Sequence, residues 1–220
     1  MKNKKGFTLA EILIALAVVG IAAAITVPVL MQNVNDNQYK SAWRNEWAIL
    51  NQAALSLMMD NGGSFVNGMG TDSNTMRDKF LTKLSFAKVC NNTAANAGNC
   101  WAPTTYNYDG TTPVSAETRA SAVLSNGSFA IFDWASATCA DGSITNWGTA
   151  NCGSIYADIN GNALPNKYGR DIFIVHVLSD GLKAYGSTNA TGAIDATNNN
   201  GCPGATSLGY GCSMTYLSAS

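Results

Sequence analysis

The chain has 220 residues, of which 46% are hydrophobic and only 12% are charged, and its net charge is -1 at pH 7. This length is sufficient for one domain with a substantial core and is marginal for two. A net charge so close to zero gives no bulk electrostatic reason to expect a nucleic-acid partner.

The N-terminus joins a short basic segment to a long apolar one. Residues 1–6 read MKNKKG, and the 20 residues 12–31 contain no charge. A run of this length can span a bilayer as a helix, and the lysines before it are expected to stay on the cytoplasmic side. We therefore predict a single-pass membrane segment that exports the rest of the chain.

Glu11 is an acidic residue inside this apolar run. A carboxylate in lipid costs about 2.5–3.5 kcal/mol on insertion scales. A cleaved signal peptide, with small residues at 22–24 for cleavage, and a simple membrane anchor both leave Glu11 without a role. If the chain is cut after Gly6, the new amine of Phe7 lies about one helical turn from Glu11. In staggered identical helices Glu11 then pairs with the Phe7 amine of a neighbour, which fixes register more than it adds stability.

The segment KKGFTLAEILIALAVVGIAAAITVP resembles the N-terminus of type IV pilins and type II secretion pseudopilins. The resemblance rests on a basic leader ending in Gly6, on Phe7 and Glu11, and on an apolar helix with Pro28 near its end. It implies that prepilin peptidase cleaves after Gly6 and N-methylates Phe7, and that Glu11 acts in assembly. It also implies that subunits leave the inner membrane for a filament whose core consists of these helices.

The resemblance also implies partners and a location. The partners would be other copies of the chain or related pilins, prepilin peptidase, an inner-membrane assembly platform, and membrane lipid before assembly. The head would lie in the periplasm or at the cell exterior, on a periplasmic pseudopilus or a surface filament. The alternative function is a membrane-anchored or secreted binding module, such as a calcium-dependent adhesin, that uses its N-terminus only for targeting.

The helical pattern continues beyond the membrane segment. Apolar residues recur at spacings of three and four between Tyr39 and Met58, which predicts an amphipathic helix. We expect one helix from about Phe7 to Asp60, with the Asn-Gly-Gly sequence after Asp60 as its end. The predicted divisions of the chain are a leader (1–6), a transmembrane or filament-core helix (7–31), an amphipathic continuation (32–61) and an exported head (62–220).

The head is predicted to be α+β. A short helix is expected from Thr75 to Val89, followed by a hairpin at 120–134 with a type I′ turn at Asn126-Gly127. Further strands are expected at 154–159, at 171–177 and after a turn at 179–181. Short strands joined by turns form an antiparallel sheet, which the long helix would cover on one face. This arrangement matches the pilin-like "lollipop" that the resemblance implies.

Six cysteines lie in the head, and six cysteines permit 15 pairings. We favour pairing between sequence neighbours, which would place each disulfide across a short loop and requires an oxidising compartment. The pairs would be Cys90–Cys100, Cys139–Cys152 and Cys202–Cys212.

One segment of the head has the composition of a calcium loop. Asp158, Asn160, Asn162 and Asp171 provide oxygen-bearing side chains at close spacing, although the match to an EF-hand is poor. Some pseudopilins hold calcium in a loop of the head, which favours this interpretation. The alternative is a connection in which Asn, Asp and Gly residues cap their own backbone.

No catalytic motif occurs in the sequence. It contains no GxSxG, Walker loop, GxGxxG or HExxH, and its Asp and Glu residues are scattered. His176, the single histidine, lies in an alternating apolar run and is interpreted as structural. We therefore expect a structural protein that is not an enzyme.

Overall fold

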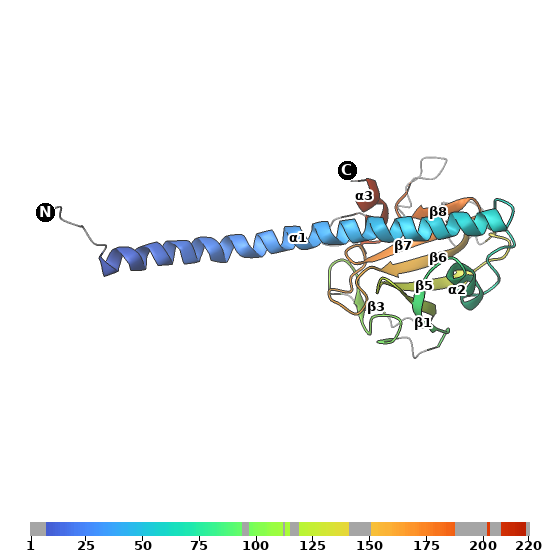
Figure 1. Cartoon of the computed structure of the whole chain (residues 1–220), viewed down its shortest axis with the longest axis horizontal. Helices are drawn as coiled ribbons and strands as arrows, with labels where there is room; N and C mark the ends of the chain where they lie inside the picture. The colour runs from blue at the N-terminus through green and yellow to red at the C-terminus, as the bar shows by residue number, and fades with distance from the viewer. Residues whose placement is uncertain are drawn as a thin grey trace. The chain divides into compact units, whose positions relative to one another are not determined.

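The computed structural model describes residues 8–93, 97–111, 113–114, 119–140, 151–187, 202 and 208–218. The chain divides into two compact units, one that extends to Gln38 and one that begins at Tyr39. Helix α1 (Leu9–Asp60) contributes to both units (Figure 1). The boundary between the units therefore falls within this helix, inside the range 32–61 that the sequence assigns to its amphipathic part.

Helix α1 is continuous from the apolar segment to its predicted end. It runs through Gly20 and Pro28 without interruption, although proline removes one backbone donor and glycine has low helix propensity. It ends at Asp60, where Gly63 N–H donates to Met58 O at 2.7 Å and closes the last turn. The expected end at Asp60 is confirmed, and the helix starts at Leu9, two residues after the expected start at Phe7, which itself lies outside the described residues.

The second unit, called the head from here on, contains a six-stranded antiparallel sheet with the order β1-β4-β5-β6-β7-β8. Strands from β4 to β8 follow one another in the chain, so they form the predicted meander, and β1 adds to its edge. The strands are β1 (Phe86–Cys90), β4 (Ala120–Leu124), β5 (Phe129–Ala135), β6 (Asn151–Asp158), β7 (Ile172–Leu178) and β8 (Gly181–Ala184). The short strands β2 (Thr105–Tyr106) and β3 (Pro113–Val114) form a separate pair.

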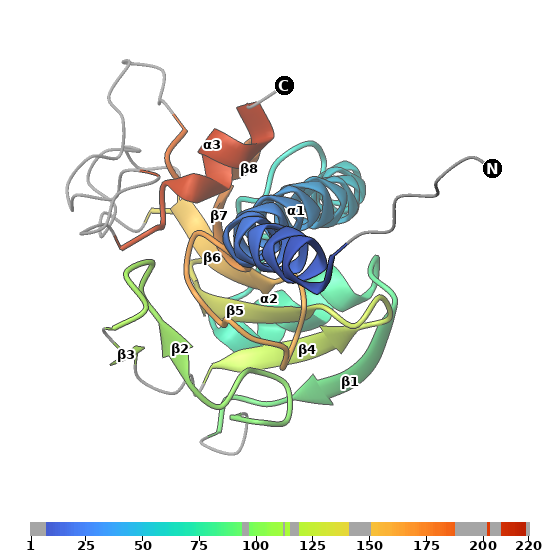
Figure 2. The ribbon, with the colours of Figure 1, turned by 90° about the vertical axis from the view of Figure 1, so that its left-hand side faces the viewer.

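Helices cover one face of the sheet. Helix α1 and helix α2 (Ser73–Leu81) lie across this face (Figure 2). Trp43 of α1 is fully buried and stacks on Phe173 of β7 with ring centroids 4.5 Å apart. Phe80 of α2 packs on Phe132 of β5, with their ring centroids 5.6 Å apart. Each buried aromatic side chain of this kind stabilises the head by about 1.5–3 kcal/mol relative to exposure.

The opposite face of the sheet is buried as well, which the sequence analysis did not predict. Trp101 from the loop before β2 packs there with Ile131 and Ile174. A row of tyrosines in edge-to-face contact extends this second cluster, with Tyr210 5.0 Å from Tyr168 and 5.8 Å from Tyr185. All seven residues of β7 are buried as a result. Loops therefore cover this face, whereas the short helix α3 (Cys212–Ser218), also unpredicted, packs on the α1 side, where Tyr216 contacts Phe173.

The predicted helix from Thr75 to Val89 is partly wrong. Helix α2 ends at Leu81, and the second half of the predicted segment forms β1. The helical spacing correctly places Met76, Phe80 and Leu84 in the core, whereas Ala87, expected on the same face, is exposed in β1. Thr82 ends the helix by donating its hydroxyl to Lys79 O at 2.7 Å, after which strand pairing with β4 takes over.

The β4–β5 hairpin is confirmed, but its turn type is not. A type I′ turn requires a positive φ at both central residues, whereas only Gly127 has one, at 88°. The loop therefore has three residues, with Gly127 in the left-handed position that follows a type I turn. Asn126 Oδ1 accepts from Ser128 N–H at 3.0 Å and from Ser128 Oγ at 2.7 Å, which holds the turn together.

Three disulfides are present, and each joins neighbours in sequence. The pairs are Cys90–Cys100, Cys139–Cys152 and Cys202–Cys212, the pairing that the sequence favours. The first ties the end of β1 to the loop that carries Trp101. The third joins Cys202 to Cys212 at the start of α3.

Candidate functional site

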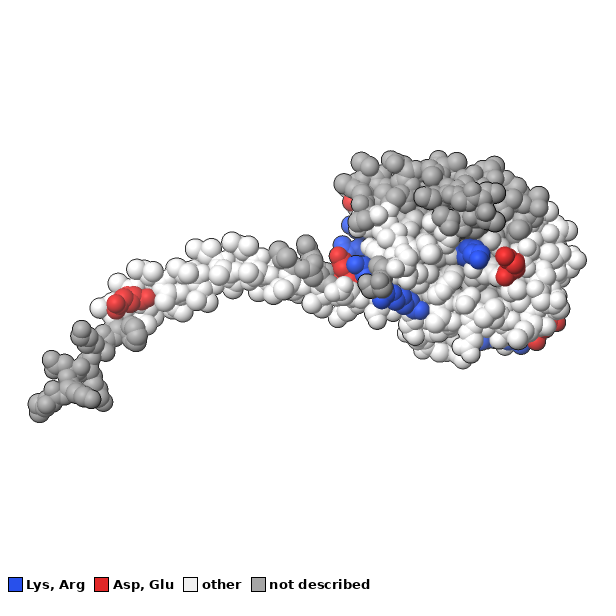
Figure 3. All heavy atoms as spheres, turned by 90° about the horizontal axis from the view of Figure 1, so that it is seen from above, with Lys and Arg blue, Asp and Glu red and all other residues white. Residues whose placement is uncertain are grey.

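The apolar half of α1 is exposed in the part of the chain that the structure describes. Leu9–Pro28 is long and apolar enough to cross a membrane by length and composition, and none of it is buried. Leu9 is 81% exposed and Ile25 is 66% exposed. Figure 3 shows this surface almost entirely white, with one red group near its N-terminal end. In an isolated chain in water, these apolar side chains would be exposed to solvent, which is unfavourable. The segment is therefore suited to lipid or to the surface of another protein.

The acidic group on this segment is Glu11, and the structure gives it a local partner. Its Oε2 accepts from the backbone N–H of Thr8 at 2.8 Å and from the Thr8 hydroxyl at 2.8 Å. The Glu11 N–H donates in return to Thr8 Oγ1 at 3.3 Å. This is a capping box, in which the residue before the helix and the third helical residue satisfy each other's backbone donors.

The capping box was missed by the sequence analysis, although the sequence contains its signal. Thr8 and Glu11 have the spacing T-x-x-E directly before an apolar run. Glu11 therefore has two roles to separate: it caps its own helix, and it is the expected partner of a neighbouring amine. Gly6 and Phe7, the expected cleavage and methylation residues, lie outside the described residues.

The predicted calcium segment forms the loop between β6 and β7. Asp158 is the last residue of β6, and Asp171 directly precedes β7. Strand pairing places Asp158 opposite Ile172, and Ile159 N–H donates to Asp171 O at 3.0 Å. The antiparallel register therefore brings two carboxylates separated by 12 residues of loop to the same place at its base.

Both carboxylates are fully buried. Burial raises the pKa of Asp158 well above its usual range, and the Asp171 carboxylate raises it further. Burial also raises the pKa of Asp171, although the backbone N–H groups of Lys167 and Asn166, which donate to it at 2.6 and 2.7 Å, act in the opposite direction. Two buried acids side by side need a proton or a cation to neutralise them.

The oxygens at this position fit a hard cation such as calcium. Asp158 Oδ2 and Asn160 Oδ1 are buried and accept no hydrogen bond from the part of the chain that the structure describes. The Asn160 side chain also contacts Asp171. Carboxylate and amide oxygens are the ligands that calcium prefers. Among the described residues no three His, Cys, Asp or Glu side chains gather in a metal-binding group, so a cation here would rely on amide or water oxygens too.

The structure does not bring all four predicted ligands together. Asp158, Asn160 and Asp171 lie at the base of the loop, whereas Asn162 is exposed. Asn166, which was not predicted, is buried, and its amide nitrogen can donate to Gly161 O at 3.2 Å and Ala163 O at 3.0 Å. These backbone contacts also support the alternative interpretation, in which Asn side chains cap their own loop.

A third buried acid, Glu46, was not singled out from the sequence. It lies on α1 at 2% exposure, and its Oε2 accepts from Asn126 Nδ2 at 2.7 Å. Burial raises its pKa, although the bonds with Asn126 and Ser128 lower it. The only sequence signal was its place among the apolar residues of α1, between Trp43 and Leu50. Glu46 ties α1 to the β4–β5 turn.

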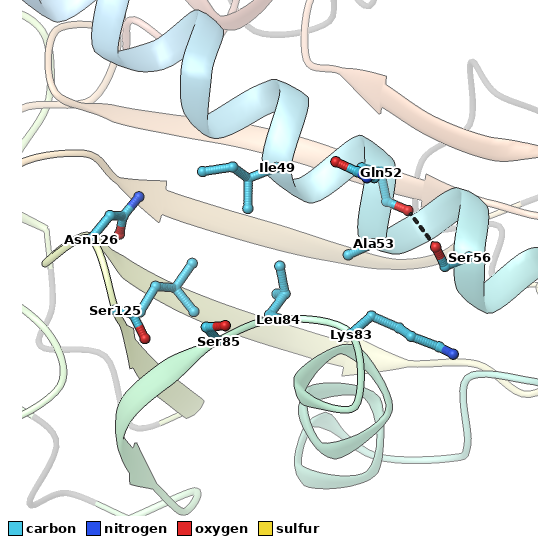
Figure 4. A pocket seen from close by; sticks show the side chains of 10 residues that line it. Ile49, Gln52, Ala53, Ser56, Lys83, Leu84, Ser85, Ser125 and Asn126 are labelled. Atoms are coloured by element: carbon cyan, nitrogen blue, oxygen red, sulfur yellow. Dashed lines mark hydrogen bonds between the residues drawn. The ribbon is translucent and has the colours of Figure 1, made fainter.

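A groove opens beside this contact. It has a volume of about 420 Å³ and lies between α1, the segment before β1, and the β4–β5 turn (Figure 4). Leu84, Leu124 and Ala53 contribute its apolar lining, and Asn126 and Lys83 its polar lining. Among the described residues that line it, the Ser56 hydroxyl donates to Gln52 O at 3.0 Å and Lys83 Nζ pairs with Asp60 at 2.6 Å.

His176 lies in the sheet, as the sequence analysis expected of a structural residue. It is 2% exposed, its Nδ1 is 3.3 Å from Ser154 Oγ, and its ring lies 5.0 Å from that of Tyr185. It occupies a position on β7 between the two strands that pair with it. Its burial and hydrogen bond are those of a packed core histidine.

The comparison with protein families supports the assignment of the N-terminus. Residues 1–27 match the model of the prokaryotic N-terminal methylation motif, the prepilin-type cleavage and methylation segment of type IV pilins and pseudopilins. Searches of curated proteins and of solved structures found no match. The motif and the apolar helix fit a prepilin-like precursor anchored in the inner membrane, and the motif points to a structural protein rather than an enzyme.

Proposed function

We propose that this chain, a prepilin-like precursor by its N-terminal motif, is a structural subunit of a type IV pilus or type II secretion pseudopilus. The observation that carries the proposal is the exposed apolar helix Leu9–Pro28 with its single acid, Glu11. Lipid would cover this surface in the precursor. The same surfaces of neighbouring subunits would cover it in a filament, at no loss of apolar burial.

Cleavage after Gly6 would create a positive charge that can pair with the carboxylate of Glu11. The new N-terminus at Phe7 would carry a positive amine one residue before Thr8. Both bonds from Thr8 go to Oε2 of Glu11, so Oε1 remains able to accept from the amine of a neighbouring chain. A buried pair of this kind is costly to break and therefore suited to setting the axial stagger between subunits.

The test is mass spectrometry of the N-terminus together with recovery of sheared filaments. We expect a mature chain that starts at N-methylated Phe7. Glu11→Ala and Glu11→Gln should be processed and inserted but should be absent from filaments. A chain cut near Ala24, or one that is uncut and unaffected by Glu11→Gln, would instead support the tethered or secreted binding module.

A matched variant separates the two roles of Glu11. Thr8→Ala removes the hydroxyl that takes part in the capping box but leaves the carboxylate in place. If Glu11 acts in assembly through a neighbour's amine, Thr8→Ala should still form filaments while Glu11→Gln does not. Equal loss of filaments in both variants would show that capping of the helix, rather than pairing between subunits, is what Glu11 supplies.

We also propose that the β6–β7 loop binds calcium. The supporting observation is the buried Asp158 Oδ2, which accepts no hydrogen bond from a described residue, together with Asn160 Oδ1 and the Asp171 carboxylate. Asp158 and Asn160 would hold the ion, with Asp171 supplying the second charge nearby. The ion would neutralise two buried acids and close the loop at its base.

Titration calorimetry of the full-length chain in detergent, after removal of metal with EGTA, tests this site. We expect calcium to bind and magnesium to bind more weakly, because a loop with few fixed ligands suits the flexible coordination of calcium. Asp158→Asn should weaken calcium binding by about tenfold or more, whereas the matched variant Asn162→Ala at the exposed position should not change it. Absence of calcium binding to the wild-type chain would mean that a proton neutralises the pair.

A further inference from the structure

The β6–β7 loop also contacts α1, at the residue where the head begins. The hydroxyl of Tyr39 donates to Leu164 O at 3.4 Å, and the guanidinium of Arg170 lies 5.9 Å from the centre of the Tyr39 ring. Tyr39 is the first residue of the head unit. The loop is thus one of the elements that hold the first turn of α1 within the head.

A single side chain connects this contact to the base of the loop. Asn160 Nδ2 donates to Leu164 O at 3.4 Å, the same carbonyl that accepts from Tyr39. The other end of the Asn160 amide is Oδ1, which is buried and unpaired among the described residues. Because the amide is planar, an ion that binds Oδ1 also fixes the direction in which Nδ2 points.

The loop is fixed on its other side by close backbone packing. Gly161 has a φ of 64°, and a Cβ at this position would come within 2.9 Å of Gly127 O and 3.3 Å of the Phe129 ring. The loop therefore lies directly against the β4–β5 turn, which α1 contacts through Glu46 and Asn126. Three segments that are distant in sequence meet at this end of the head: the start of its α1 portion, the β4–β5 turn and the β6–β7 loop.

From these contacts we infer that calcium in the β6–β7 loop strengthens the attachment of the head to α1 at Tyr39, through Asn160 and the carbonyl of Leu164. The inference rests on the proposed calcium site and adds a consequence to it. Without the ion, Leu164 and Asp171 are the described residues that hold the Asn160 amide, and the α1–loop contact is correspondingly weaker. With the ion, the local opening of α1 around Tyr39 becomes less frequent.

Hydrogen exchange of the full-length chain in lipid nanodiscs, in calcium and in EGTA, measures this effect. Calcium should slow exchange of the α1 amides at 39–46 by about two- to tenfold, the range expected for one additional well-formed hydrogen bond. Tyr39→Phe, which keeps the ring beside Arg170 and removes only the hydroxyl, should bind calcium with unchanged affinity but lose this protection.

A control variant and a binding measurement separate the possible failures. Tyr216→Phe alters another tyrosine beside α1, whose ring lies 5.2 Å from Lys40 Nζ, and should keep the calcium-dependent protection. If calcium binds but protects 39–46 equally in wild type and Tyr39→Phe, or not at all, the link to α1 is wrong and the calcium site stands. If no calcium binds in calorimetry, the proposed site is wrong and the link falls with it.

Discussion

The apolar half of α1 and strand β7 are similar in composition and opposite in environment. Ile14, Val19 and Ile25 of α1 are each about two-thirds exposed, at 65%, 65% and 66%. Every residue of β7 is buried between α1 on one face and the tyrosine-lined loops on the other. An apolar sequence therefore does not by itself indicate a protein core. Whether an apolar segment stabilises the fold or is left exposed depends on which other parts of the chain pack against it.

The two units are therefore stabilised by different interactions. The head buries its apolar residues within one chain and adds three disulfides. The apolar segment of α1 has backbone hydrogen bonds and the Thr8–Glu11 cap, but its side chains are exposed, which suits a lipid environment or another protein surface. Changes in the head should therefore affect folding, and changes in the apolar segment should affect insertion or assembly.

The largest effect is expected from Trp43→Ala. Trp43 is fully buried, stacks on Phe173, and donates from Nε1 to Ser213 O at 2.8 Å. Its removal should lower the free energy of unfolding of the head by about 3–5 kcal/mol, through a cavity and a lost hydrogen bond. Thermal unfolding monitored by near-UV circular dichroism measures this. The matched change Val19→Ala, in the exposed segment, should leave the unfolding of the head unchanged; an equal loss would contradict the separation of the units.

Removal of the Cys90–Cys100 disulfide should have the next largest effect. The bond closes a short loop and ties the edge strand β1 to Trp101, so the double variant to Ser should cost about 2–3 kcal/mol. Arg77, which donates to Cys90 O at 2.7 Å, should keep the end of β1 near α2. Denaturant unfolding measures the loss in the free energy of unfolding. Unchanged stability would show that hydrogen bonds alone hold β1 at the edge of the sheet.

Glu46→Gln should stabilise the head, by roughly 1 kcal/mol at neutral pH. Burial raises the pKa of Glu46 above its unfolded value, so its favourable contribution is complete below about pH 4.3 and is lost as the pH rises through the folded pKa. Glutamine keeps an oxygen that accepts from Asn126 and carries no charge. The stability difference between variant and wild type should therefore grow between about pH 4 and neutral pH, as measured by urea unfolding. A difference that is independent of pH would show that Glu46 is not titrating in this range.

The regular elements of this fold are predictable from sequence because their signals are local. The apolar run, the spacing of aromatic residues on α1, and the alternation in 171–177 each indicate one element, and the structure has it. The prediction of one helix over 75–89 is wrong in its second half, because Phe86–Cys90 pairs with β4 and is extended there. The burial of the second face was not predictable, because loops and a tail distant in sequence provide its cover.

The candidate sites show the same limit. Asp158 and Asp171 could be proposed as a pair from composition, but their burial and contact follow from strand register. Asn162 has the same side chain as Asn160 and a similar place in the sequence, yet it is exposed. Glu46 belongs to no motif, and its burial was not predictable because a carboxylate on an amphipathic helix is normally solvated. The Thr8–Glu11 cap, by contrast, was predictable, because its T-x-x-E spacing directly precedes the apolar run.

The smallest effect is expected from Thr8→Ala. It removes one side-chain acceptor and one donor of the capping box and should cost about 0.5–1 kcal/mol of local helix stability. Because the loss is confined to the helix start, hydrogen exchange in nanodiscs should show faster exchange of the amides at 9–12 and no change in the head. Thr26→Ala, whose hydroxyl donates to Ala22 O at 3.0 Å inside the same helix, is the matched control and should leave the helix start unaffected. If Thr8→Ala leaves the exchange of these amides unchanged, the cap adds nothing once lipid surrounds the helix, and Glu11 would then be retained for its partners alone.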